Sequence, residues 1–85
     1  MATVTLRYWA AAKDAAGIAE QVVTADTLAA ALRLAGSAEV RARLGPVLER
    51  SSYLIDGAQV GLRVADSVQL AEGSVIEVLP PFAGG

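Results

Sequence analysis

Ser74-Val75-Ile76-Glu77-Val78-Leu79 runs directly into Pro80-Pro81-Phe82-Ala83-Gly84-Gly85. Ile76 and Val78 recur with a period of two, which predicts a strand at 74–79 with one buried face. Pro80 and Pro81 have no backbone N–H, so they cannot extend a sheet ladder and favour a stiff, extended exit. Glycine has no Cβ, so Gly84 and Gly85 can pass close to another surface. The stretch therefore predicts a last strand followed by a narrow tail, residues 80–85, which ends on a carboxylate and reaches at most about 20 Å when fully extended.

The length and composition predict one domain, residues 1–79, carrying that tail. Although 54% of the residues are hydrophobic, many of these are alanine, so leucine and valine must build most of the core. The chain has no cysteine and no histidine, so we expect no disulfide and no bound metal or other cofactor. The net charge of −2 and the absence of a basic run argue against a nucleic-acid partner. No apolar run or charged leader points to a membrane, and we expect a soluble cytoplasmic protein.

The first segment, residues 3–9, also alternates. Val4, Leu6 and Tyr8 share the face that we expect to be buried, whereas Trp9 falls on the opposite face. An exposed tryptophan at the end of a strand is typical of a partner contact. Residues 10–17 are predicted to be a connection of small residues, and residues 20–25 to be a second strand that forms a hairpin with the first.

The middle of the chain predicts helices. Thr24 or Asp26 offers an N-cap for a main helix that Gly36 terminates. A second, shorter helix is expected over Ser37–Leu44, with Val40 and Leu44 facing inward and Gly45-Pro46 as the stop. Arginines at 41, 43 and 50 are interpreted as solvated surface charges. The apolar stripe of the main helix consists of Leu28, Ala31, Leu32 and Ala35.

The remaining segments predict strands and turns. Residues 53–55 are expected to form a third strand, Asp56-Gly57 a turn, 59–61 a short edge piece and 66–73 a loop. The order of a hairpin, then helix, then further strands is typical of an α+β fold. A mixed sheet packed on one main helix, the β-grasp arrangement, fits this order.

Catalytic motifs are absent from the sequence. We find no nucleophile elbow, Ser-His-Asp set, phosphate loop or metal-ligand cluster, and we interpret Glu72 and Glu77 as isolated surface acids. The reactive group that remains is the carboxylate of Gly85. Adenylation by ATP on another protein would make it an electrophile, and a sulfur donor could then displace AMP to leave a thiocarboxylate.

Four segments carry a resemblance to a known family. The tail Leu79–Gly85, the opening strand Val4–Ala10, the turn Lys13–Gly17 and the loop Asp66–Gly73 resemble those of the β-grasp, ubiquitin-like sulfur carriers (the MoaD/ThiS family). The resemblance is closest to the small subunit of molybdopterin synthase. Where that family often continues the loop with Asp-Glu, this chain has Ser74-Val75.

This resemblance implies a β-grasp fold and a sulfur carrier without an active site of its own. Gly85 would be the site of the adenylate and the thiocarboxylate, which supplies sulfur for the dithiolene of molybdopterin in molybdenum cofactor biosynthesis. The implied partners are an E1-like adenylating and sulfurating enzyme, which uses ATP, and the large catalytic subunit of molybdopterin synthase. Trp9 and Leu79 would contact that subunit and Phe82 would enter its active-site cleft. The rest of the implied tail and partner-binding site consists of Pro80, Pro81, Ala83 and Gly84.

Three alternatives stay open from the sequence. The chain could be a sulfur carrier for thiamine or cysteine biosynthesis, although the paired prolines favour the molybdopterin branch. It could be a ubiquitin-like protein modifier, whose carboxylate forms isopeptide bonds to lysines. It could also be a β-grasp interaction domain with an idle tail.

Overall fold

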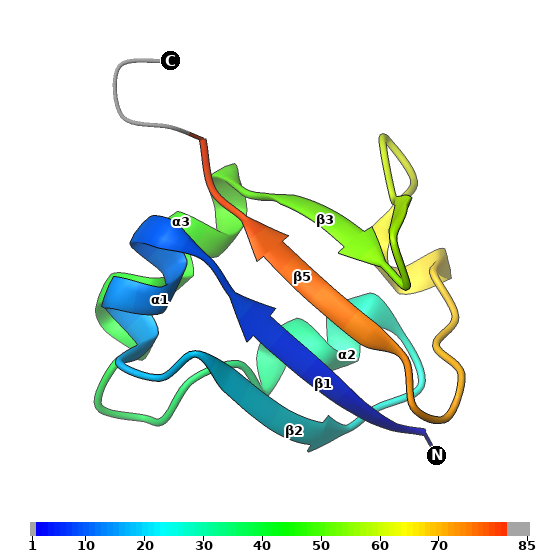
Figure 1. Cartoon of the computed structure of the whole chain (residues 1–85), viewed down its shortest axis with the longest axis horizontal. Coiled ribbons are helices and arrows are strands. Elements are labelled where there is room, and N and C mark those ends of the chain that lie inside the picture. Colours follow the sequence, from blue (N-terminus) through cyan, green and yellow to red (C-terminus); the bar gives the residue numbers. More distant parts are fainter. Residues whose placement is uncertain (1, 82–85) are drawn as a thin grey trace.

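The computed structural model describes residues 2–81 and contains a five-stranded sheet with the strand order β2-β1-β5-β3-β4 (Figure 1). Its two central strands, β1 and β5, run parallel, and each other neighbouring pair is antiparallel. The sheet is therefore mixed, as predicted. In chain order the elements are β1 (Thr3–Tyr8), α1 (Ala10–Ala16), β2 (Glu20–Thr24), α2 (Leu28–Arg33), α3 (Arg41–Arg50), β3 (Ser52–Ile55), β4 (Ala58–Gln59), the 3-10 helix η1 (Ala65–Ser67) and β5 (Val75–Leu79).

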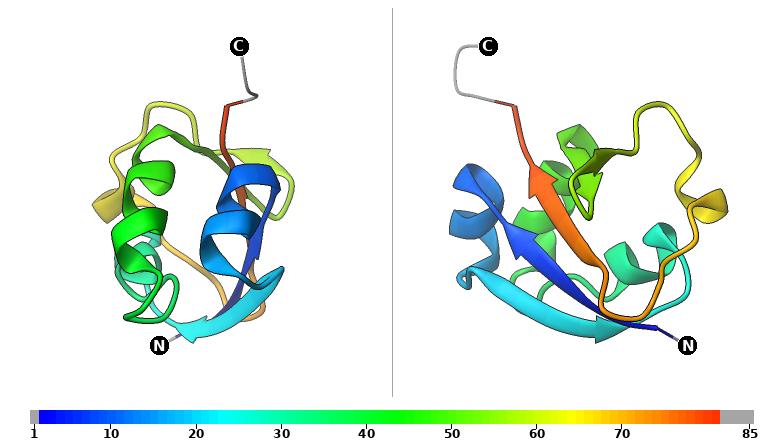
Figure 2. Two further views of the ribbon diagram at one scale, coloured as in Figure 1. Left: turned by 90° about the vertical axis from the view of Figure 1, so that its left-hand side faces the viewer. Right: turned by 45° about the vertical axis from the view of Figure 1, so that its right-hand side comes forward.

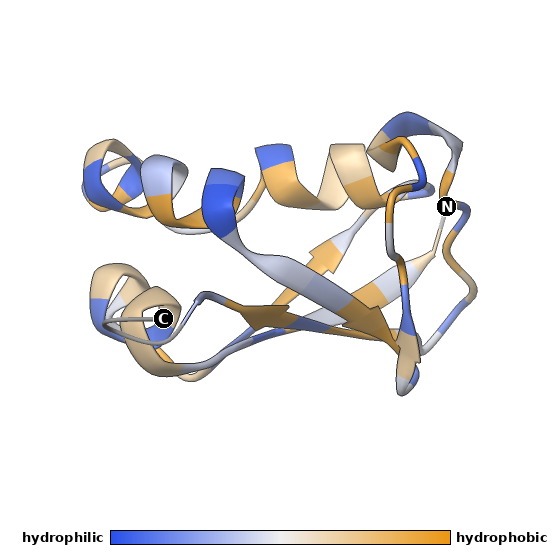
Figure 3. Ribbon diagram, turned by 90° about the horizontal axis from the view of Figure 1, so that it is seen from above, coloured by the Kyte–Doolittle hydropathy of each residue, from blue (hydrophilic) through white to orange (hydrophobic). Residues whose placement is uncertain are grey.

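One face of the sheet forms the core. The predicted inward residues of β1 and β5 are all buried, with relative exposures of at most 1%. Helices α2 and α3 lie against this face (Figures 2 and 3), and apolar residues of both helices belong to the core. Leu28 and Ala31 of α2 and Leu44 of α3 fill the space between the layers. The predicted α+β class and β-grasp arrangement are confirmed.

Residues 10–16 form a helix, so the prediction of an irregular connection was wrong. Alanine is the best helix former, and five of the seven residues of α1 are alanine. Gly17 ends the helix in the left-handed conformation, with φ +76°. Ala12, Ala15 and Ala16 are buried. These alanines give no contrast between apolar and polar faces, which is why a pattern of hydrophobicity did not reveal the helix.

The predicted end of the second helix was also wrong. Helix α3 begins at Arg41 and continues through Gly45 and Pro46 to Arg50. Proline inside a helix removes one backbone hydrogen bond. Here Leu44 is buried on one side of Pro46, and Val47 and Leu48 pack against the core on the other. Tertiary packing on both sides of the proline therefore keeps the helix continuous.

The N-cap of the main helix is Thr27 rather than Thr24 or Asp26. The Thr27 Oγ1 atom accepts a hydrogen bond from the backbone N–H of Ala30 at 3.2 Å. Thr24 still belongs to β2. The other boundaries are shifted slightly: β1 ends at Tyr8, β3 begins at Ser52, β4 spans Ala58–Gln59, β5 begins at Val75, and the predicted 66–73 loop overlaps η1.

Two of the three predicted surface arginines hold elements together. Arg41 donates hydrogen bonds to the carbonyl oxygens of Arg33, the last residue of α2, and of Ala35, two residues further on. The Nε atom of Arg43 donates to the carbonyl oxygen of Ala15 at 2.8 Å and so connects α3 to α1. These guanidinium groups satisfy carbonyls at helix ends that have no partner within their own helix. All three arginines are exposed, as predicted, and two of them also connect elements of the fold.

Gln21 forms a polar bridge between the sheet and the end of α2. Its Oε1 atom accepts from the Tyr8 hydroxyl at 2.7 Å and from the backbone N–H of Gly36 at 2.8 Å. Its Nε2 atom donates to the carbonyl oxygen of Leu34 at 3.0 Å. The side chain of Gln21 thus supplies a hydrogen-bond acceptor to the buried hydroxyl of Tyr8 and holds the backbone of the turn that follows α2.

Tyr53 makes the stability of the fold sensitive to alkaline pH. Its hydroxyl donates to the carbonyl oxygen of Leu48 at 2.6 Å, and burial raises the pKa of Tyr53 from 10.0 to about 12. Between these two values the unfolded chain releases the phenolic proton while the folded chain retains it. The free energy of unfolding is therefore expected to fall as the pH rises through this window.

The measurement is the urea midpoint of the wild type and of Tyr53→Phe below and within this window. The urea midpoint of Tyr53→Phe should fall less between the two pH values than the midpoint of the wild type. Some loss should remain, because burial also raises the pKa of Tyr8. Equal alkaline losses in the two proteins would contradict this role of Tyr53.

Candidate functional site

The predicted tail begins beside the junction between β1 and α1. Tyr8 pairs with Val78, so Trp9, which follows β1, and Leu79, the last residue of β5, lie at the same end of the sheet (Figure 1). The backbone N–H of Trp9 donates to the carbonyl oxygen of Val78 at 3.3 Å, which extends the ladder by one step. Pro80 is partly buried and Pro81 is exposed. The predicted site residues Phe82, Ala83, Gly84 and Gly85 lie outside the described residues.

Trp9 lies at the surface, as predicted. It is the N-cap residue of α1, and 46% of it is exposed. Ala10 follows with φ +48°, a left-handed conformation that is unfavourable for a residue with a Cβ. The chain thus turns sharply immediately after the indole, and strain of this kind is concentrated at functional positions in proteins.

A hollow of about 330 Å³ lies next to the root of the tail. We call it the docking hollow. Its walls are apolar side chains from the β1–α1 junction and the end of β5, namely Trp9, Ala10, Leu79 and Pro80. Sequence reasoning had selected Trp9, Leu79 and Pro80 but not Ala10. An exposed apolar recess with an aromatic wall is suited to an apolar side chain of a partner protein.

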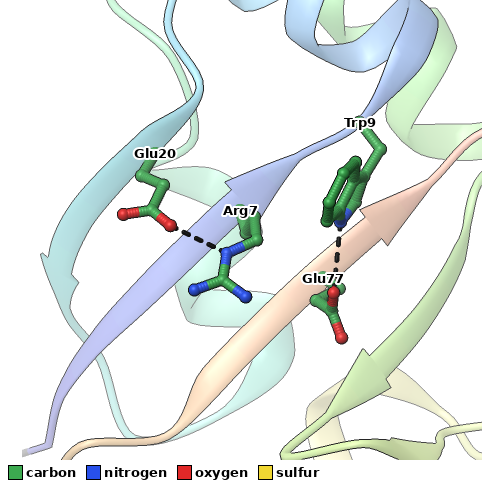
Figure 4. Close-up of polar contacts among 4 residues, drawn as sticks. All are labelled: Arg7, Trp9, Glu20 and Glu77. Atoms are coloured by element: carbon green, nitrogen blue, oxygen red, sulfur yellow. Dashed lines mark hydrogen bonds and ion pairs between the residues drawn. The ribbon is translucent and has the colours of Figure 1, made fainter.

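Glu77 is an addition to the site that sequence reasoning missed. The indole Nε1–H of Trp9 donates to the Oε1 atom of Glu77 at 3.2 Å (Figure 4). Glu72 also has a partner, because its Oε1 atom accepts from the backbone N–H of Thr3 at 2.9 Å. The two glutamates thus bind different groups at the surface and do not form a carboxylate pair, although neither is without a partner. A signal was available only in the register between β1 and β5, which places Glu77 beside Arg7.

The described part of the chain offers a binding surface at this end. Within residues 2–81 there is no group of three or more His, Cys, Asp and Glu side chains placed to hold a metal ion. The helices of the same residues are too short or too polar to span a bilayer. What the arrangement presents is a partly exposed indole, an apolar recess and the point where the tail leaves the sheet.

Solved structures of other proteins share this fold. The structure is similar to the small archaeal modifier protein 1 (SAMP1) from Methanosarcina acetivorans, with a TM-score of 0.81, 21% identity and coverage of 100% of this chain and 98% of that one. SAMP1 from Haloferax volcanii is similar with a TM-score of 0.68 and 20% identity, and the match covers 98% of this chain and 99% of that one. The structure is also similar to a chain in the complex of subunits 1 and 2 of molybdopterin-converting factor from Helicobacter pylori 26695. The TM-score is 0.70 at 19% identity, and the match covers 98% of this chain and 99% of that one.

At these identities the structural matches establish the fold. No curated protein matches the sequence. The model of the ThiS family, in contrast, matches residues 6–85, which is nearly the whole chain. The chain therefore belongs to the ThiS family, and its fold is that of the ubiquitin-like β-grasp sulfur carriers.

Proposed function

We propose that this chain is the sulfur-carrying small subunit of a molybdopterin synthase. In this role it carries sulfur on the carboxylate of Gly85 and supplies it for the dithiolene of molybdopterin. The observation that carries the proposal is the position of Pro80 and Pro81, the first two residues of the predicted tail. Two prolines leave β5 beside an exposed indole and an apolar hollow, so a partner that binds the hollow also receives the tail.

Loading of the tail proceeds in two steps on a partner enzyme. A carboxylate oxygen of Gly85 attacks the α-phosphorus of ATP and pyrophosphate leaves, which gives an acyl adenylate. A sulfur nucleophile at the oxidation level of sulfide, such as hydrosulfide, then attacks the acyl carbon; AMP and a proton leave, and the carrier ends as a thiocarboxylate. ATP is thus a substrate of an E1-like adenylating enzyme, and the carrier holds no cofactor of its own.

The tail residues fit this route chemically. Pro80 and Pro81 restrict the direction in which the tail leaves the domain, because their φ angles are fixed. Ala83, Gly84 and Gly85 add little width, so they suit a narrow channel. Phe82 is the one large side chain beyond the prolines and would anchor the tail in the cleft of the large subunit. Trp9 and Leu79 would contact that subunit at the docking hollow.

The similarity to one chain of a complex of subunits 1 and 2 of molybdopterin-converting factor supports the choice of partner. The test is reconstitution of the chain with the E1-like enzyme, ATP, a sulfur source and the large synthase subunit from the same genome. We expect the intact mass of the chain to increase by the exchange of one oxygen for sulfur and molybdopterin to form. A loaded chain that supports thiamine or cysteine synthesis but no molybdopterin would assign it to another branch of sulfur transfer.

A protein modifier is the second candidate, favoured by the similarity to two archaeal SAMP1 structures. In that case an amine attacks the acyl adenylate in place of sulfur, AMP leaves and an isopeptide bond forms. The two functions differ in the products found in the native host. Peptides in which a lysine carries the carboxyl-terminal segment of this chain through an isopeptide bond would support the modifier, whereas a free thiocarboxylate supports the carrier.

A further inference from the structure

We propose that Glu77 is a positioning residue that holds the indole of Trp9 in the orientation required for docking. The inference deepens the proposed function and rests on it, because it concerns binding of the partner at the docking hollow. The carrying observation is the hydrogen bond from Trp9 Nε1 to Glu77 Oε1 at 3.2 Å, which joins the end of β1 to the middle of β5 (Figure 4).

The sheet register places Glu77 where it can do this. Glu20, Arg7 and Glu77 are cross-strand neighbours on β2, β1 and β5, on the face of the sheet opposite the core. Two carboxylates therefore flank one guanidinium. The Nε atom of Arg7 donates to Glu20 Oε2 at 2.7 Å (Figure 4). Because Arg7 is directed toward Glu20, the carboxylate of Glu77 is left to accept the indole N–H.

Trp9 is a wall shared by two hollows. On one side lies the docking hollow, with Leu79 and Pro80. On the other lies a wider recess of about 410 Å³, lined by Arg7, Tyr8, Trp9, Lys13, Ala19 and Glu20. Rotation of the indole would enlarge one of these spaces and narrow the other. The hydrogen bond to Glu77 therefore fixes the shape of the docking hollow before a partner arrives.

Preorganisation of this kind contributes to affinity. A side chain that is already fixed loses less rotamer freedom when it becomes part of an interface. Replacing Glu77 with alanine is expected to free the indole and to raise the Kd for the large synthase subunit roughly three- to tenfold. Glu77 faces away from the core, so the unfolding midpoint should change little. Glu77→Gln keeps an amide oxygen as acceptor and should bind nearly as well as the wild type.

The first arm of the experiment uses the isolated full-length chain. Trp9 is the single tryptophan, so its indole N–H gives one assignable resonance in a ¹H–¹⁵N spectrum. We expect this resonance to move, and to exchange faster with solvent, in Glu77→Ala but to move much less in Glu77→Gln. Asp14→Ala, which removes one exposed carboxylate from α1, is the control matched in charge.

The second arm measures the Kd of each variant for the large synthase subunit by calorimetry. The proposal predicts that only Glu77→Ala loses affinity. Equal losses for Glu77→Ala and Glu77→Gln would indicate a charge effect and overturn the positioning role, as would an indole that moves without any change in Kd. An unchanged indole resonance in Glu77→Ala would overturn it as well. Failure of the wild type to bind would overturn the proposed function first, and the inference with it.

Discussion

One alanine added after Gly85 is expected to lower molybdopterin formation at least about a hundredfold. The added residue moves the reacting carbon by about 3.3–3.6 Å from the position that both partner sites must hold. A displacement of only about 1 Å can already cost on the order of a hundredfold in rate. Deletion of Gly85 should be as damaging, because it draws the carboxylate back by the same distance. The measurement is the rate in the reconstituted reaction, together with the intact mass of the tail.

The matched control is an alanine inserted after Leu62. This residue lies in a loop and is fully exposed, with a relative exposure of 103%. The insertion adds the same mass and the same residue type to the chain, and it leaves the tail unchanged. Both variants should unfold at the wild-type midpoint, and only the extended tail should lose transfer. An extended chain that gains sulfur and supports product at the wild-type rate would contradict the carrier function in this form.

Gly36→Ala is expected to lower the free energy of unfolding by about 2–5 kcal/mol. Gly36 has φ +75°, and a Cβ there would lie 2.8 Å from both Leu44 Cδ2 and Val40 Cγ2. Both neighbours belong to the core, with relative exposures of 0% for Leu44 and 8% for Val40, so they have little room to move. The left-handed conformation costs about 1–2 kcal/mol and overpacking about 1–3 kcal/mol. The measurement is chemical denaturation.

Gly17→Ala is the control that separates strain from crowding. Its φ of +76° is almost the same, but a Cβ there would meet no atom within 4 Å. We therefore expect the free energy of unfolding of Gly17→Ala to fall by about 1–2 kcal/mol, because only the cost of the left-handed backbone conformation applies there. Equal losses for the two variants would show that the contacts with Leu44 and Val40 do not matter. The backbone N–H of Gly36, which donates to Gln21, is retained in Gly36→Ala.

The parts of the fold that the sequence predicted are those with a strong local pattern. The alternation of Val4, Leu6 and Tyr8 gave the first strand and its buried face, and Ile76 and Val78 gave the last. Helix α1 was missed because its alanines have a high helix propensity but do not form a periodic pattern of apolar and polar residues. The course of α3 was missed because a Gly-Pro pair locally favours a stop, whereas packing in the core favours a continuous helix.

The candidate site was likewise predicted only where a local sequence pattern specifies it. The exposure of Trp9 followed from its place in an alternating segment, and it is confirmed. The bond from Trp9 to Glu77 depends on the register between two strands that are far apart in the sequence, and no local pattern specifies that register. The strained backbone of Ala10 arises from the turn into α1, a helix that had not been predicted. The sulfur-carrying role of Gly85 stays a prediction for the reconstituted system.

The parallel pairing of β1 with β5 has a consequence for biosynthesis. Leu6 aligns with Ile76, so the central contact of the sheet closes a loop that contains most of the chain. Contacts between such distant segments slow folding, because a large entropy of loop closure is lost before the pairing can stabilise the product. A nascent chain whose last strand is still inside the ribosome lacks the middle of its sheet. Because Leu79 and Pro80 also line the docking hollow, a chain that lacks β5 and the residues after it has neither the middle of the sheet nor this hollow.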